Sequence, residues 1–132
     1  MSMTINGIHH VALKCKDKAT FEEAIRLYRD ILELPVVRTW GTAEEPCAMI
    51  DLGGSLLEVF SNAGCQLPGG VFAHLALRTD DPDGWIDRVR QAGYTVTMEP
   101  KDIAFSCEPP AYARIAFFRG PAGEEIEFCA ER

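Results

Sequence analysis

An internal repeat is the feature that most constrains the fold of this chain. The stretch GIHHVALKCKD at Gly7–Asp17 matches FAHLALRTDD at Phe72–Asp81 when it is shifted by 64 positions (74 − 10). This shift places His10 on His74 and leaves the neighbouring histidine of the first stretch without a counterpart. A chain of 132 residues that repeats itself in this way is expected to fold as two similar modules.

A second match supports the same division. SLLEVF at Ser55–Phe60 corresponds to EEIEFC at Glu124–Cys129, and places Glu58 on Glu127 at a shift of 69 (127 − 58). The shift has grown by five residues between the two matches, and we expect the extra residues in the proline-rich loop Lys101–Pro110.

Each half of the chain reads as one strand, one helix and then three strands. The first helix is expected over Thr20–Leu34, with Thr20 and Glu23 as a capping box, and the second over Pro82–Ala92, with Asp81 as its N-cap. Short β-type runs follow each helix, at Pro35–Trp40, Pro46–Leu52, Ser55–Ser61, Tyr94–Glu99, Tyr112–Arg119 and Glu124–Cys129. The expected fold class is α+β, with two βαβββ modules in a single domain spanning residues 1–132. The modules cover about 5–63 and 71–130, and residues 64–70 link them.

The composition excludes several classes of partner. The net charge is −7 and the basic residues form no cluster, which argues against nucleic acid and anionic membrane. No apolar run is long enough for a membrane span, and the first residues do not resemble a signal peptide, so we expect a cytoplasmic protein. The five cysteines are scattered, and we expect them to be reduced core residues.

Strand alternation brings four potential metal ligands onto one face. Side chains two residues apart point to the same side of a strand, so His10, Glu58, His74 and Glu127 all face away from the side that packs under the helices. Two imidazoles and two carboxylates suit a divalent cation, with Ni²⁺ or Zn²⁺ favoured and Mn²⁺, Fe²⁺ or Co²⁺ as further choices. The recurrence of the same residue types in both halves distinguishes this pattern from ordinary buried or exposed side chains.

The repeated motifs resemble those of the vicinal-oxygen-chelate superfamily, which includes glyoxalase I, epimerases, extradiol dioxygenases and bleomycin-resistance proteins. The motifs that carry the resemblance are the H-[VL]-A-L starts at His10 and His74, YRDILELP, LLEVF and GPAGEEIEF. The resemblance implies paired βαβββ modules that form an open cupped mixed sheet around one metal. A ligand set of His, Glu, His and Glu is most similar to bacterial glyoxalase I, a lactoylglutathione lyase, because other members replace the carboxylate at the position of Glu58.

That resemblance implies a particular chemistry. The expected reaction is isomerisation of a glutathione hemithioacetal to S-lactoylglutathione, by proton transfer through a metal-stabilised enediolate. Glu127 is the expected base and Glu58 its partner on the opposite side of the substrate. A homodimer is also implied, with His10 and Glu58 of one chain joined by His74 and Glu127 of the other, although other superfamily members complete the site within one chain.

Candidate substrate contacts follow partly from strand alternation and partly from the resemblance. Lys14 and Arg78 are predicted to face the cup and to pair with a substrate carboxylate, whereas Arg38 and Asn62 lie at positions that resemble glutathione contacts. The acidic, proline-rich loop 101–112 departs from the glyoxalase I pattern. Two alternatives therefore stay open: another metal-dependent epimerase or isomerase on the same fold, and a metal-free binding protein of the bleomycin-resistance kind.

Overall fold

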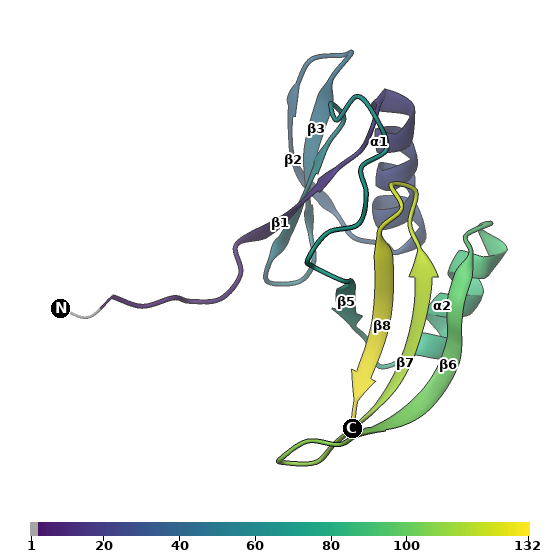
Figure 1. Ribbon diagram of the computed structural model, residues 1–132. Coiled ribbons are helices and arrows are strands. Elements are labelled where there is room, and N and C mark those ends of the chain that lie inside the picture. The colour runs from purple at the N-terminus through teal and green to yellow at the C-terminus, as the bar shows by residue number, and fades with distance from the viewer. Residues whose placement is uncertain (1–2) are drawn as a thin grey trace. The chain divides into compact units, whose positions relative to one another are not determined.

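The computed structural model describes residues 3–132 and shows two βαβββ modules, which confirms the predicted fold class. The chain divides into two compact units, Met1–Leu67 and Pro68–Arg132 (Figure 1). Each unit contains a mixed four-stranded sheet. The assignment of the whole chain to a single domain stays a prediction.

The first unit is built on a sheet in the order β1-β4-β3-β2. β1 pairs in parallel with β4, and the other neighbours are antiparallel. A helix packs against β4, and its buried side chains cover one face of the sheet. The elements are β1 (His10–Lys14), α1 (Lys18–Ile25), η1 (Arg26–Ile31), β2 (Val36–Gly41), β3 (Pro46–Asp51) and β4 (Leu56–Phe60).

The second unit repeats this plan in the order β5-β8-β7-β6. β5 pairs in parallel with β8, and β8 and β6 pair antiparallel with β7. Helix α2 packs against β6, β7 and β8 (Figure 1). The elements are β5 (Leu75–Arg78), α2 (Pro82–Gln91), β6 (Val96–Phe105), β7 (Ala111–Arg119) and β8 (Glu125–Glu131).

The start of the second helix is as predicted, and that of the first is not. The carboxylate of Asp81 accepts a hydrogen bond from the Gly84 amide at 3.0 Å and caps α2. In the first unit Asp17, not Thr20, is the N-cap, because its carboxylate accepts from the Thr20 amide at 2.9 Å. Thr20 therefore lies inside the first turn, and the expected capping box does not form. The helix also changes from α1 to the π-helical stretch η1 before it ends.

The core of each unit lies between its helix and its sheet. In the first unit Tyr28 from η1 packs in the same buried layer as Leu57 and Val59 of β4. In the second, Phe128 stacks on Phe118 with ring centroids 5.3 Å apart, and both side chains are buried. Burial of these apolar groups is the main contribution that holds each helix on its sheet.

The loop expected at residues 101–112 is shorter than the sequence suggests. β6 continues through Pro100 as far as Phe105, so that the connection to β7 covers only residues 106–110. The sequence pattern predicts a strand that ends at Glu99, just before Pro100, and proline lacks a backbone donor. β6 is an edge strand, however, and its pairing with β7 is irregular between Met98 and Lys101, which is where a sheet tolerates proline. The residues added to the second module therefore extend a β-hairpin.

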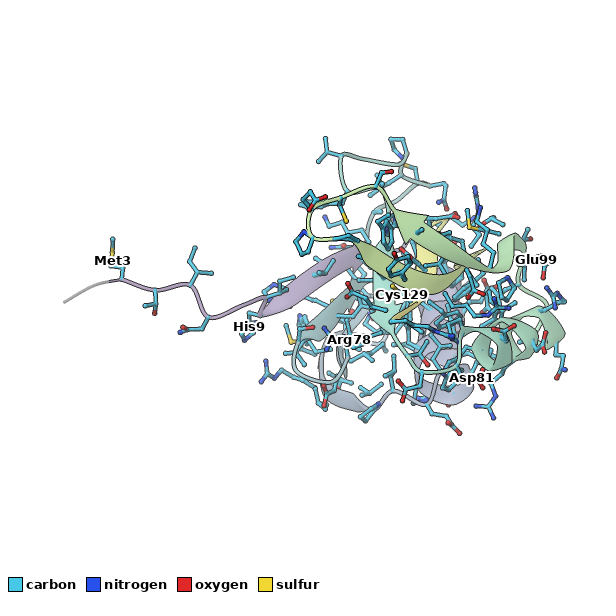
Figure 2. All side chains as sticks on the ribbon, turned by 90° about the horizontal axis from the view of Figure 1, so that it is seen from below. Met3, His9, Arg78, Asp81, Glu99 and Cys129 are labelled. Carbon is cyan, nitrogen blue, oxygen red and sulfur yellow. The ribbon has the colours of Figure 1, made fainter. Side chains whose placement is uncertain are left out.

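The N-terminal segment is extended and exposed. Figure 2 shows Met3 at the outer end of the segment that leads to His9 and then into β1. Within residues 3–132 no helix is long and apolar enough to cross a membrane.

Candidate metal-ligand pairs in the two modules

The first module brings His10 and Glu58 together at the junction of β1 and β4. Ala12 lies directly opposite Glu58 in the parallel pairing, and His10 lies opposite Leu56. Residues opposite each other point to the same side of a sheet, so the two side chains share one face. The His10 Nε2 atom is 3.5 Å from Glu58 Oε1, and the side chains are 40% and 17% exposed.

The second module repeats this arrangement. Ala76 of β5 lies opposite Glu127 of β8, just as Ala12 lies opposite Glu58. His74 precedes β5, and its Nε2 atom is 3.0 Å from Glu127 Oε1. The face of each sheet that carries Glu58 or Glu127 is called here the carboxylate face. In both modules the residue opposite the glutamate is alanine, whose methyl group takes up little space on the carboxylate face.

Glu127 is the more deeply buried of the two carboxylates. Its side chain is 11% exposed, and burial raises the pKa of Glu127, an effect that the neighbouring His74 partly opposes. Desolvation disfavours the charged form of a carboxylate, so Glu127 holds a proton more readily than an exposed glutamate does. His74 is fixed from its other side by an edge-to-face contact with Phe117, with ring centroids 5.3 Å apart.

His9 lies next to His10, although strand alternation predicts that it points the opposite way. The Nδ1 atoms of the two rings are 2.8 Å apart, and the rings meet edge to face. The prediction is wrong because β1 begins only at His10, so alternation does not apply to the residue before it. One of the two Nδ1 atoms carries the proton that it donates to the other. The adjacent pair of histidines in the sequence was the available signal for this contact.

The predicted substrate-contact residues lie at several places. Arg38 shares a row with Met49 and Glu58 across the sheet, and its guanidinium donates to the Met49 sulfur at 3.5 Å. Lys14 lies on the carboxylate face with its Nζ 5.9 Å from the centre of the Phe60 ring.

Arg78 ends β5 opposite Cys129 and is exposed. Asn62 follows β4 in an irregular exposed segment. Lys14 and Arg38 thus lie near the first ligand pair, Arg78 lies on the carboxylate face of the second module, and Asn62 belongs to neither sheet.

The cysteines divide into two groups. All five are free, and Cys65 and Cys107 are exposed, so the expectation that every cysteine is a core residue is wrong for these two. Cys47 is buried and Cys129 is partly buried, and burial raises the pKa of both thiols, with Glu58 and Glu127 respectively adding to the rise. These two thiols are therefore held in the protonated form beside the carboxylates.

Each pair fits one half of a metal site. Imidazole nitrogen and carboxylate oxygen are suitable ligands for Zn²⁺, Ni²⁺, Mn²⁺ and Fe²⁺. Within each described unit, however, only two such side chains meet, and no group of three or more His, Cys, Asp or Glu residues forms there. A metal held by protein ligands alone would need both pairs.

Comparison with protein families finds one match that covers most of the chain. The family model for the Glyoxalase/Bleomycin resistance protein/Dioxygenase superfamily matches residues 7–128. No curated protein sequence matches the chain significantly.

Solved structures with the same fold include a glyoxalase I, a resistance protein and a binding protein. A glyoxalase I variant from Zea mays has a TM-score of 0.74 at 19% identity, covering 92% of this chain and 43% of that one. The antibiotic-binding protein TnmS3 from a Streptomyces species has a TM-score of 0.72 at 20% identity, covering 99% and 100%. The fosfomycin resistance protein FosX from Listeria monocytogenes, solved with Mn(II) and sulfate, has a TM-score of 0.71 at 15% identity, covering 96% and 93%. At these identities the likeness concerns the fold.

Proposed function

This chain belongs to the Glyoxalase/Bleomycin resistance protein/Dioxygenase superfamily, and from that premise we propose that it is a metal-dependent isomerase of the glyoxalase I type. The observation that carries the proposal is the equivalence of the two ligand pairs. The same His–Glu contact occurs in both modules, at 3.5 Å and 3.0 Å, with an alanine in the same register position beside each glutamate. A binding protein on this fold does not require such pairs, whereas a metal enzyme does.

The proposed ligands are His10, Glu58, His74 and Glu127. A divalent cation held by them, Ni²⁺ or Zn²⁺ in the first instance, would act as a Lewis acid on the oxygens of the substrate. His10 and His74 bind through Nε2, the atom that faces the glutamate in each pair. His9 holds His10 in the required tautomer, because a proton on Nδ1 of His10 is donated to Nδ1 of His9 and leaves Nε2 free.

Glu127 is the proposed base. It removes a proton from the carbon beside the substrate carbonyl and returns it to the adjacent carbon, while Glu58 lies on the opposite side of the substrate. The raised pKa of Glu127 supports this role, because a carboxylate whose pKa lies nearer to neutral pH holds the transferred proton better than an ordinary one.

The proposed substrate is a glutathione hemithioacetal. Lys14, Arg38 and Arg78 supply positive charge for the carboxylates of the thiol carrier, and Asn62 supplies an amide. The whole chain carries a net charge of −7, but Lys14 and Arg38 are close to the first ligand pair. This local positive charge favours an anionic substrate there.

We propose further that the site is shared in a homodimer, where each metal is held by the first module of one chain and the second module of its partner. The presence of only two ligands within each unit supports a site built from two units. Exposed large apolar side chains near the first ligand pair support contact with another surface; they include Ile8, just before β1, and Val11, within β1.

The decisive experiment is turnover of the hemithioacetal formed by methylglyoxal and glutathione. Protein stripped of metal with a chelator is reloaded separately with Ni²⁺ and Zn²⁺, and metal content is measured alongside activity. Glu127→Gln should abolish metal-dependent turnover, because glutamine cannot accept the proton. Glu131→Gln is the matched control, since Glu131 is an exposed glutamate two strand positions beyond Cys129 and should change neither metal content nor rate.

The outcomes separate the proposal from its alternatives. Stoichiometric metal without turnover would retain the site and replace the reaction with an epimerisation or another isomerisation. Neither metal nor turnover would favour a ligand-sequestering protein, a function for which the full-length match to TnmS3 is the supporting observation.

A further inference from the structure

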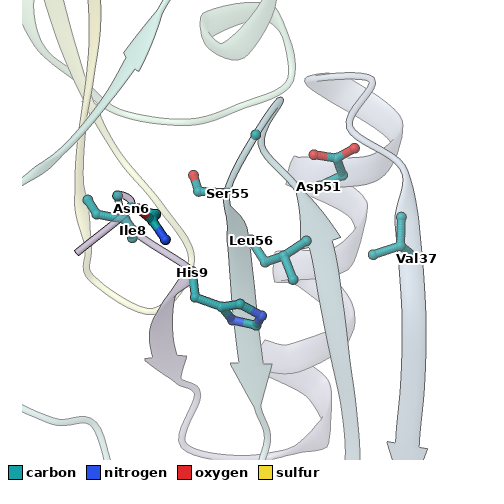
Figure 3. A pocket seen from close by; sticks show the side chains of 9 residues that line it. Asn6, Ile8, His9, Val37, Asp51, Ser55 and Leu56 are labelled. Carbon is teal, nitrogen blue, oxygen red and sulfur yellow. The ribbon is translucent and has the colours of Figure 1, made fainter. Parts of the chain in front are cut away.

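A pocket lies beside the first ligand pair, within the first unit. Its volume is about 520 Å³, which is within the usual range for small-molecule sites. It is formed where the segment before β1 approaches the beginnings of β2 and β4 and the end of β3 (Figure 3). The residues that decide its chemistry are Asn6, His9, Val37, Asp51, Ser55 and Leu56.

The pocket is close to His10. Leu56 lies opposite His10 in the parallel pairing and is two residues before Glu58, a distance of roughly 6.6 Å along a strand. Asp51 lies opposite Leu56 in the next strand, so its side chain is on the same face. Figure 3 shows the side chains of Leu56 and Val37 pointing toward each other, which gives the pocket an apolar wall.

The lining of the pocket is acidic, which disfavours an anionic ligand. Asp51 is its only carboxylate, and neither lysine nor arginine is among its nine lining residues. Two cations of the same face contact other side chains, because Arg38 donates to the Met49 sulfur and Lys14 lies over the ring of Phe60. The face therefore has an acidic end at Asp51 and a basic end at Lys14.

The Asp51 side chain is fixed in position by a hydrogen bond. Its Oδ1 atom accepts a hydrogen bond from the Gly53 amide at 2.7 Å, which fixes the carboxylate over the turn between β3 and β4. Asp51 lines the pocket and is partly exposed, so its carboxylate is accessible to a bound ligand. Ser55 and Asn6 add polar groups that can bind a donor.

We propose that this pocket binds a primary ammonium group attached to a short apolar body. The ammonium pairs with Asp51, and the apolar body packs against Leu56 and Val37. An anionic group would be repelled by Asp51, so this pocket is distinct in chemistry from the contacts proposed for glutathione carboxylates. Binding here requires neither metal nor turnover, and its test is therefore independent of the proposed reaction.

Three probes that differ only in their charged or polar head test the proposal. Phenethylammonium, phenethyl alcohol and phenylpropanoate are titrated into metal-free protein at neutral pH and low salt, and amide chemical shifts are followed by NMR. Phenethylammonium should bind about five- to tenfold more tightly than phenylpropanoate, since a partly exposed ion pair contributes modestly. The largest shifts should fall on two glycines: Gly53, whose amide donates to Asp51, and Gly54, which lines the pocket.

Two variants and a control locate the effect. Asp51→Asn keeps an acceptor for the Gly53 amide but removes the charge, and should abolish the preference for the ammonium head. Val37→Trp, on the exposed edge strand β2, should fill the pocket and weaken all three probes. Glu22→Gln, an exposed substitution on α1, should change nothing. Equal binding of the three heads, an unchanged preference in Asp51→Asn, or shifts confined to other residues would overturn the proposal.

Discussion

Two inactive variants should restore activity to each other if the metal ligands are shared between chains. His10→Ala removes one ligand from the first module, and His74→Ala removes one from the second. Both side chains are about two-fifths exposed (40% and 42%), so neither change opens a cavity in the core. In a two-fold symmetric dimer, a mixed pair combines the intact first module of one chain with the intact second module of the other.

The expected recovery follows from this arrangement. Random exchange makes about half of the dimers mixed, and each mixed dimer has one complete site out of two, so turnover should return to roughly a quarter of the wild-type value. The assay is hemithioacetal turnover with added Ni²⁺ or Zn²⁺ after the two variants have been unfolded together and refolded. Subunit exchange is verified by mass spectrometry with one chain isotopically labelled.

A second mixture supplies the control. His10→Ala combined with Glu58→Gln places both defects in the same module, so every mixed dimer has two damaged sites and no activity should return. If subunit exchange is complete and wild-type protein treated in the same way is active, absence of recovery in the first mixture would refute the shared site. Recovery in both mixtures would refute the assignment of these residues to separate pairs.

Three further substitutions test the second ligand pair, the first ligand pair and the core in turn. Glu127→Gln should raise the unfolding midpoint of the metal-free protein at neutral pH. Burial raises the pKa of Glu127 in the folded protein, so the wild-type protein loses stability as the pH rises through this raised pKa. The stability gained by Glu127→Gln should therefore vanish below the ordinary glutamate pKa of 4.5. Equal unfolding midpoints of the two proteins at every pH would contradict this reasoning. His9→Ala should weaken Zn²⁺ binding by about ten- to a hundredfold, measured by competition with a chromogenic chelator, because His10 loses its Nδ1 partner. Phe128→Ala should lower the free energy of unfolding by about 3–5 kcal/mol in urea, since Phe128 is 2% exposed and stacks on Phe118; a loss below about 1 kcal/mol would show that this stack is not central to the core.

The repeat in the sequence predicts the two modules. Strand alternation predicts that the histidine and the glutamate of a module lie on the same face, but not that the two side chains are in contact. His10 and Glu58 were placed on one face by counting residues in strands, and β1 and β4 are regular enough for that count to hold. The same applies to Glu127 in the central strand β8. Such positions are predictable because a shift of one residue would turn the whole apolar set away from the helix.

Other features depended on interactions that the sequence does not display. The position of His9 could not be obtained from alternation, because the strand begins at the next residue. The length of β6 was underestimated since Pro100 is compatible with an edge strand, and edge or centre is a property of the assembled sheet. The pocket around Asp51 joins residues from four separate segments and has no motif of its own.

The long β6–β7 hairpin has a consequence for how this protein can diverge. Its tip at residues 106–110 is far along the strands from the row that contains Phe117 and Glu127. Glu127 is bonded on both sides, to β7 and to β5, so its position does not depend on the tip. Because each doubling of a flexible loop costs only about 0.6 kcal/mol, insertions and deletions at the tip are nearly free. Variation in the length of the tip can therefore accumulate while the residues proposed to hold the metal stay fixed.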